Sequence, residues 1–255
     1  MVNIDTVYQR VLALTNKEQR GYITPQEFNL LANQAQMEIF EQYFYDMEQT
    51  KKRYNDKYEY GVLDTLKEKI APFENYNQTK ALEAFTGFNV LRLNIPDLYK
   101  LGMIRIKYPE SGINKMFVAE KMDLQEAAIY EASPLVGSNT QYTRPIYFLN
   151  NDIMFTTNDD IIVRFKPNPV NLTTGNVKFS YIKRPNKVSW GYVVVSSKAL
   201  FDPNPTKTTH FELHQSEEVE LVYKILKLAG VVIQKPDIFG AGGSMENQQI
   251  QQEKQ

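Results

Sequence analysis

The stretch from Tyr22 to Tyr45, YITPQEFNLLANQAQMEIFEQYFY, decides the fold that the sequence predicts. It opens with a helix-start signal: Thr24 can cap a helix, Pro25 suits its first position, and Glu27 can complete a capping box. Apolar residues then recur at spacings of three and four, which predicts a helix of about six turns with one apolar face. These residues are Phe28, Leu31, Ala32, Ala35 and Ile39.

The apolar face of this helix needs a partner, and the sequence offers one from Ser216 to Gln234. Ser216 can cap a helix there, with Glu217 and Glu218 in its first turn, and Pro236 stops it. Its apolar stripe consists of Val219, Val222, Ile225, Leu226, Ala229 and Ile233. We therefore expect the two helices to share one hydrophobic core.

Shorter helices and a strand-rich middle complete the expected order. Residues 3–16 predict a first helix capped by Asn3 or Asp5, and residues 63–70 predict a short helix that Pro72 ends. From about residue 85 the apolar period changes to two, which is typical of strands with one buried and one solvated face.

Eight strands are expected in this region. They cover residues 90–93, 103–108, 146–149, 152–155, 161–166, 177–181, 193–195 and 210–214, with a brief helix at 122–131. Asn150 and Asn151 predict a tight hairpin turn between the third and fourth strands, because asparagine tolerates positive φ. The fifth and sixth strands predict a second hairpin around the loop PNPVNLTTGN.

The elements together predict an α+β fold, with an N- and C-terminal helical bundle and an inserted antiparallel β domain. The expected domains are a discontinuous helical bundle of residues 1–84 plus 215–236, a β-rich domain of residues 85–214, and a flexible Gln-rich C-terminal arm of residues 237–255. The arm lacks the apolar content to fold alone, so it is either disordered or ordered on a partner.

Composition narrows the function classes. At 255 residues the chain can bury a sizeable core, and 42% hydrophobic and 23% charged residues are typical of a globular protein. A net charge of −1 gives no general attraction to nucleic acid or anionic membrane. Zero cysteines exclude disulfides and thiolate metal sites, which fits synthesis in a reducing cytoplasm. We expect no membrane span and no signal peptide, because no apolar run approaches the ~18–20 residues of a span.

The residues that could carry catalysis form weak patterns. His210 and His214 stand in HFELH rather than HExxH, and on a strand they would lie about 13 Å apart, too far to share a metal. Gly240–Gly243 lacks the strand before and helix after that a dinucleotide-binding turn requires. Asp159–Asp160 fits a turn, and Glu217–Glu218 fits a helix start. We predict no enzyme, cofactor or metal, although catalytic groups that meet only in space stay open.

Aromatic residues are the more informative feature. The 16 Tyr and 14 Phe suit strands and contact surfaces, because tyrosine combines apolar area with a polar tip. The candidate partner contacts are Tyr43, Tyr45, Tyr54, Tyr58, Trp190 and Tyr192. Trp190, the only tryptophan, fits a core position equally well.

Three stretches carry a family resemblance: ITPQEFNLLANQAQMEIFEQYF (23–44), YIKRPNKVSWGY (181–192) and FELHQSEEVELVYKILKLAGVVI (211–233). They resemble the head-to-tail adaptor, or ring (tail hub), proteins of short-tailed bacteriophages, particularly the crAss-like phages. The stretches cover under a quarter of the chain but bracket most of it. The resemblance implies a helical bundle with an inserted β domain, assembled as a twelve-fold ring beneath the portal. The β region is large for a minimal adaptor, which favours a more elaborate ring.

The expected function is therefore a structural virion protein, a subunit of a connector ring between portal and tail that forms part of the DNA channel. Its implied partners are its own copies, the portal protein, further tail ring or barrel proteins, and viral DNA in non-specific passage. Near-zero net charge suits such a channel, because basic linings bind phosphates strongly. Particles would assemble in the host bacterial cytoplasm.

The alternative is a carbohydrate-binding or adhesin module of a virion or bacterial surface assembly, with exposed tyrosines and Trp190 stacking on sugar rings. Alternating strands suit it. Long amphipathic helices at both ends do not, because sugar-binding sandwiches are usually all-β.

Overall fold

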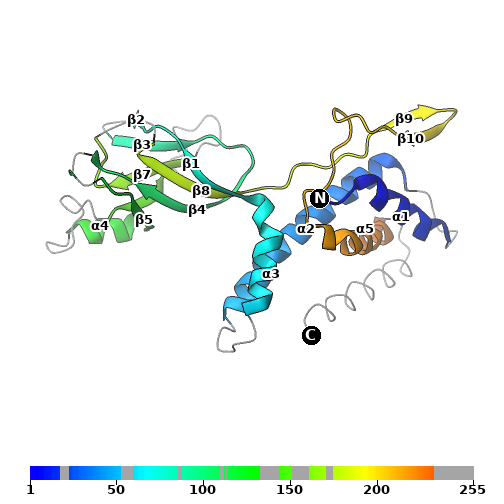
Figure 1. The fold of residues 1–255 in the computed structure, drawn as a ribbon, viewed down its shortest axis with the longest axis horizontal. Coiled ribbons are helices and arrows are strands. Elements are labelled where there is room, and N and C mark those ends of the chain that lie inside the picture. The colour runs from blue at the N-terminus through cyan, green and yellow to red at the C-terminus, as the bar shows by residue number, and fades with distance from the viewer. Residues whose placement is uncertain are drawn as a thin grey trace. The chain divides into compact units, whose positions relative to one another are not determined.

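The computed structural model describes residues 1–17, 23–52, 60–85, 88–109, 112, 114–132, 144–150, 161–170 and 175–232. The chain forms two compact units (Figure 1). Unit 1 joins residues 1–72 to residues 185–255, and unit 2 is residues 73–184. The boundaries differ from the predicted ones. Residues 73–84, predicted to be in the helical bundle, belong to unit 2, and residues 185–214, predicted to be in the β domain, belong to unit 1.

Four helices build unit 1: α1 (Ile4–Lys17), α2 (Pro25–Lys52), α3 (Tyr60–Ile70) and α5 (Glu218–Val232). The predicted capping box of α2 is confirmed, because Thr24 Oγ1 accepts from Glu27 N at 3.3 Å and Glu27 Oε2 accepts from Thr24 N at 2.9 Å. These bonds lower the pKa of Glu27, mainly through the bond from the Thr24 backbone. At α1, Asn3 Oδ1 accepts from Asp5 N at 2.9 Å.

The packing of α2 against α5 is confirmed, and α1 also packs against α5. Phe28 on α2 and Ile225 on α5 are fully buried. The start of α5 differs from the prediction: His214 caps a 3₁₀ turn, η5 (Gln215–Glu217), because its Nδ1 accepts from Ser216 N. Val219, predicted to be in the apolar stripe, is 41% exposed. Ile233 lies outside the described residues.

Two ion pairs tie η5 and the start of α5 to the other helices. Glu217 of η5, 1% exposed, pairs with Lys69 of α3 at 2.7 Å. Glu218 pairs with Arg10 of α1 at 2.9 Å. The acidic pair therefore has a second structural role besides its place at a helix start.

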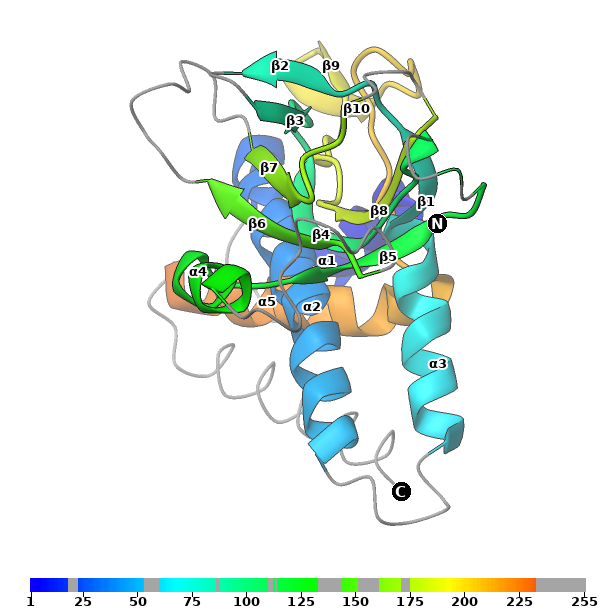
Figure 2. The same ribbon diagram turned by 90° about the vertical axis from the view of Figure 1, so that its left-hand side faces the viewer.

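Unit 2 is built on an eight-stranded sheet in the order β1-β8-β4-β5-β6-β7-β3-β2. The strands are β1 (Glu74–Thr79), β2 (Glu83–Phe85), β3 (Phe88–Leu93), β4 (Leu98–Ile106), β5 (Phe117–Lys121), β6 (Ile146–Asn150), β7 (Ile161–Lys166) and β8 (Val177–Lys183). A 3₁₀ turn, η2 (Ala71–Phe73), precedes β1. The sheet is curled (Figure 2). Alternate side chains from several strands form one apolar core that includes Leu91, Ile104, Val163 and Phe179.

Neighbouring strands run antiparallel except β5 and β6, which are parallel. Helix α4 (Leu124–Ala132) connects them and packs against β6, with Ala127, Ile146 and Phe148 in a small separate core. Parallel neighbours need such a crossover, because a tight turn can only reverse the chain.

The predicted fold class, a helical bundle with an inserted antiparallel β domain, is wrong. The structure is mixed α/β, with a large curled eight-stranded sheet and five α-helices in the described part of the chain. The α4 crossover makes the sheet mixed rather than antiparallel. In unit 1 the helices also bury extended chain, including Val188, Trp190 and Phe211, so the core is no simple bundle.

Strand pairing also corrects the sequence analysis. The predicted hairpin of 161–166 with 177–181 is wrong: β7 pairs with β3 and β6, whereas β8 pairs with β1 and β4. The predicted strand at 210–214 is reduced to a single bridge between Val2 and Phe211. The predicted hairpin of 146–149 with 152–155 is not tested, because its second strand lies outside the described residues. Among those residues, none of the helices is long and apolar enough to cross a membrane.

Candidate functional site

Three amide side chains on α2 hold the extended segment 186–190. Asn29 accepts from Trp190 N at 2.7 Å, and Asn33 accepts from Val188 N at 2.9 Å while donating to Val188 O at 2.8 Å. Gln36 Nε2 donates to the carbonyl of residue 186 at 2.8 Å. We call Asn29, Asn33 and Gln36 the amide ladder.

The spacing of the amide ladder explains why it fits. Steps of four and three residues keep side chains on one helix face and advance about 4.5–6 Å. Alternate residues of an extended chain advance about 6.6 Å and point the same way. The side chains of α2 therefore supply the hydrogen bonds that a neighbouring strand would supply in a sheet.

Trp190 anchors the end of this segment in the core of unit 1. Its side chain is 2% exposed, its ring centroid lies 4.3 Å from that of Tyr8, and its Nε1 donates to Asp5 Oδ1 at 2.9 Å. The rings of Tyr192 and Phe201 stack beside it, with centroids 5.8 and 5.9 Å away. Because the indole N–H has a hydrogen-bond partner and the ring is packed on several sides, Trp190 holds this part of the chain rigidly.

Trp190 holds a hairpin of two strands, β9 (Tyr192–Val195) and β10 (Lys198–Phe201). Tyr192 pairs with Phe201 and Val195 pairs with Lys198, so the loop is Ser196–Ser197. Both serines have positive φ, 49° and 62°, as a type I′ turn requires. This turn twists with the strands and keeps the hairpin regular.

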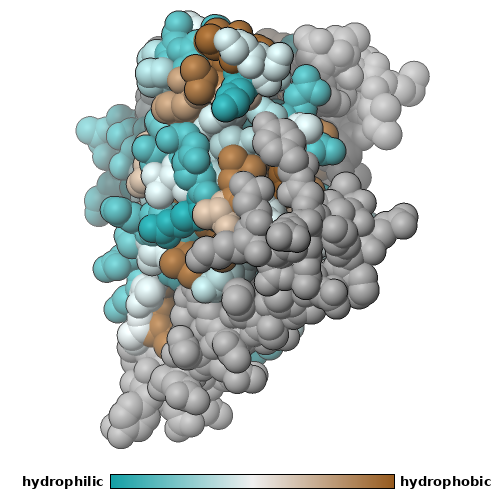
Figure 3. Space-filling model, turned by 90° about the vertical axis from the view of Figure 1, so that its right-hand side faces the viewer, coloured by the Kyte–Doolittle hydropathy of each residue, from teal (hydrophilic) through white to brown (hydrophobic). Residues whose placement is uncertain are grey.

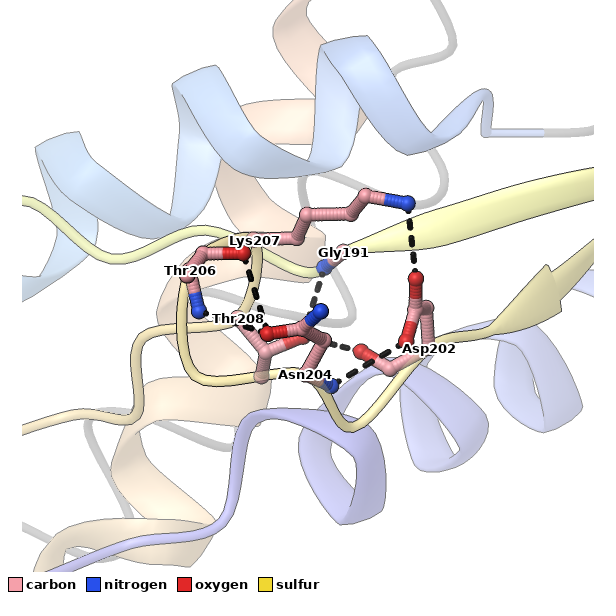
Figure 4. A network of polar contacts seen from close by, with 6 residues as sticks. All are labelled: Gly191, Asp202, Asn204, Thr206, Lys207 and Thr208. Atoms are coloured by element: carbon pink, nitrogen blue, oxygen red, sulfur yellow. Dashed lines mark hydrogen bonds and ion pairs between the residues drawn. The ribbon is translucent and has the colours of Figure 1, made fainter.

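The base of the hairpin is closed by Gly191 and a polar loop (Figure 4). Gly191 N donates to Thr208 Oγ1 at 3.2 Å, and Asp202 N donates to Gly191 O at 2.9 Å. A Cβ at Gly191 would lie 2.5 Å from Thr208 Oγ1 and 2.8 Å from Lys207 Cβ. This position therefore needs glycine for the close approach of the loop.

The loop itself is organised by Asp202 and Asn204 (Figure 4). Asp202 accepts from Lys207 Nζ at 2.8 Å and from Asn204 N at 3.1 Å, and Asn204 Oδ1 accepts from Thr206 N at 3.1 Å. These bonds, the one to Lys207 first, lower the pKa of Asp202. The ionised carboxylate therefore stabilises the loop that closes the hairpin.

One face of the hairpin is apolar and exposed. Opposite and alternate residues share a face, so Val193, Val195, Lys198 and Leu200 lie together, and we call them the hairpin face. Val193, Val195 and Leu200 are 44%, 51% and 54% exposed. Figure 3, viewed towards the end from which the hairpin projects, shows hydrophobic residues at the surface beside hydrophilic ones. Apolar side chains grouped in this way make the hairpin face a candidate interaction surface.

Unit 1 also has a shallow, open depression between α2 and α5 of about 350 Å³. We call it the α2–α5 hollow, and it is lined by Glu38, Glu41, Gln42, Tyr45 and Lys224. Lys224 is 7% exposed and lies 3.9 Å from Glu220, and it is the one lysine beside two glutamates in this lining. Glu41 is exposed, which leaves the rim of the hollow acidic.

The predicted contact residues divide between core and surface. Trp190 and Tyr43 are buried, at 2% and 3% exposure, and Tyr192 is half-buried against Trp190. Tyr45 is 59% exposed at the α2–α5 hollow. Tyr54 and Tyr58 lie outside the described residues, as does the arm at 237–255. The buried Trp190 cannot offer its ring to a sugar.

The weak catalytic candidates have local structural roles. His210 Nδ1 accepts from Ile4 N at 3.3 Å, whereas His214 caps η5. Within the described ranges, His, Asp and Glu side chains form no group of three that could hold a metal ion. Asp159–Asp160 and Gly240–Gly243 lie outside these ranges.

Neither the hairpin face nor the amide ladder was predicted from the sequence. VVVSSKALF at 193–201 carries the signal for the first: β-branched residues, two small turn residues, and a second apolar stretch. The signal for the second was the amide spacing beside the apolar stripe of α2. Comparison with known proteins finds no family model and no curated relative that matches the chain.

Proposed function

We propose that this chain is a structural virion protein that assembles with its own copies into a connector ring between portal and tail. The hairpin face carries the proposal. A two-stranded hairpin is marginally stable in water, yet this one is fixed at its base by Trp190 and presents three exposed apolar side chains. Such a rigid apolar surface is suited to burial against another protein chain.

The arrangement of the resembling stretches supports the proposal. Helix α2, residues 185–192 and helix α5 belong to one unit, where the amide ladder and the α2–α5 packing join them. These parts of the resembling stretches thus form one packed module, from which the hairpin projects (Figure 1), whereas residues 181–184 of the second stretch belong to unit 2.

A ring requires two different complementary surfaces on each copy, and the contact must close by rotation. The proposed partners are further copies of the chain in a twelve-fold ring, the portal protein, and the next tail ring or barrel protein. Viral DNA would pass through without sequence-specific contact, in keeping with a net charge of −1.

Native mass spectrometry and negative-stain microscopy of the full chain, alone and with portal protein, test the proposal. We expect a closed ring that Val193→Ser, Val195→Ser and Leu200→Ser together disrupt, because the variant removes the apolar contact. Val62→Ser with Val118→Ser is the matched control, since both valines are exposed elsewhere on the chain. A wild-type chain that stays monomeric in both conditions would overturn the proposal.

A further inference from the structure

We infer that the hairpin face of one copy docks onto the α2–α5 hollow of the next copy, an inference that rests on the proposed self-assembly. The hairpin face supplies the projecting, apolar surface. The hollow supplies a shallow, open depression of about 350 Å³ on the same unit. The occupant is thus a second copy of this chain.

Charge complementarity identifies the pair of surfaces. Lys198 is the charged member of the hairpin face and is exposed. Glu38 and Glu41 line the hollow, and Lys224 in the same lining lies 3.9 Å from Glu220. A lysine brought to this rim would therefore meet excess negative charge, and burial by apolar neighbours would strengthen the attraction.

The apolar parts of the two surfaces also correspond. Tyr45 in the hollow is 59% exposed, and its ring offers apolar area with a polar tip. Val195 and Leu200 flank Lys198 on the hairpin face and can cover that ring. The aliphatic stem of the lysine can lie along the same surface while its ammonium group reaches the carboxylates.

The positions of the two surfaces make the contact head-to-tail. The hairpin base is fixed at Asn29, and the hollow lies beside Glu38 to Tyr45 further along α2. At about 1.5 Å per residue this is a separation of roughly 14–24 Å along the helix. Two distinct patches on each copy give a heterologous contact, which forms a ring when the rotation closes.

A charge-swap series tests the pairing in the full-length chain. Lys198→Glu and Glu41→Lys should each weaken assembly about tenfold or more in sedimentation velocity, because each puts like charges opposite one another. Combining both substitutions in one chain should restore assembly. Lys187→Glu and Glu48→Lys are matched controls, since both side chains are exposed and lie outside the two surfaces.

Crosslinking tests the contact directly, because the chain has no cysteine of its own. A Lys198→Cys chain mixed with a Glu41→Cys chain should give a disulfide-linked dimer under mild oxidation. A Lys187→Cys chain mixed with the same partner should not.

The outcomes separate this inference from the proposed function. Rings that form normally with Lys198→Glu, or that give no crosslink in the mixed sample, would overturn the docking mode and leave the ring proposal standing. A doubly substituted chain that assembles no better than the single variants would also overturn it. A wild-type chain without any oligomer would overturn both.

Discussion

The two β regions of this protein treat their apolar residues in opposite ways. In the eight-stranded sheet, Leu91 and Val163 are 0% exposed, because each strand contributes to one enclosed core. In the β9–β10 hairpin, Val193 and Val195 are about half exposed although the local pattern is equally strand-like. The difference lies in the number of strands. Two strands leave both faces open to solvent, whereas the curled sheet encloses the side chains on its inner face.

The comparison teaches that order and burial have separate causes in the hairpin. Its order comes from Trp190, the amide ladder and the loop around Asp202, which act on the base. Its face contributes little to the stability of the single chain. An apolar surface that is held in place without being needed for folding is available for a partner.

Removing the anchor should have the largest effect. Trp190→Ala should lower the free energy of unfolding of unit 1 by about 3–5 kcal/mol, because it empties a buried aromatic site and leaves Asp5 without the indole donor. Urea denaturation measures the change. Trp190→Phe keeps an aromatic ring there and should cost clearly less. Equal losses in the two variants would show that ring packing contributes little.

Crowding the base of the hairpin should come next. Gly191→Ala should cost about 1–3 kcal/mol, because the new Cβ would lie 2.5 Å from Thr208 Oγ1 and 2.9 Å from the carbonyl carbon of Lys207. Gly61→Ala on α3 is the matched control, since its Cβ would meet nothing within 4 Å. Thermal unfolding of both variants checks this. Similar melting temperatures would contradict the close approach.

The same substitution in the two regions tests the comparison itself. Val163→Thr should cost about 1–3 kcal/mol, because it buries a hydroxyl in the sheet core. Val193→Thr should change the free energy of unfolding by less than about 0.5 kcal/mol, as is usual for surface sites. Denaturant midpoints measure both. A loss at Val193 as large as at Val163 would show that the single chain already buries the hairpin face.

Acid should loosen the hairpin base. The pKa of Asp202 is lowered from its ordinary value of 3.8, so the ionised carboxylate stabilises the folded loop above that pH. This contribution is lost as pH falls below 3.8 through the lower folded pKa. Hydrogen exchange at Gly191 and Asp202 amides from about pH 5 to about pH 2 should show the opening. Asp202→Asn should remove this pH dependence; an unchanged profile would contradict it.

Local signals in the sequence predicted the long helices and several of the strands, but they missed β1, β2, β5 and β10 and did not predict how the strands pair. The capping box at Thr24 and Glu27 needs only four residues, and the structure confirms it. Alternation identified strands at 161–166 and 177–181, but it carries no information on pairing, so their predicted hairpin was wrong. The α4 crossover depends on contacts between β5 and β6 that are distant in sequence. The expected antiparallel sheet was wrong for that reason.

The site shows the same division. Trp190 was identified by its rarity, yet its burial depends on Tyr8 and Asp5 at the other end of the sequence. The exposed state of Val193 could not be read from β-propensity, because the same residue type fills the sheet core. Only the absence of further strands beside β9 and β10, within the described residues, decides it.

The hydrogen bonds of Gln36 affect how far the length and sequence of the hairpin segment can change. Its amide donates to the carbonyl of residue 186, and its Oε1 accepts from Glu212 N at 3.4 Å, while Asn186 Nδ2 donates to Glu212 Oε1 at 2.8 Å. The segment that carries the hairpin, residues 186–212, is thus joined at its two ends by these hydrogen bonds. Because doubling the length of a closed loop costs only about 0.6 kcal/mol, this segment could be lengthened, shortened or exchanged with little loss to the rest of the unit.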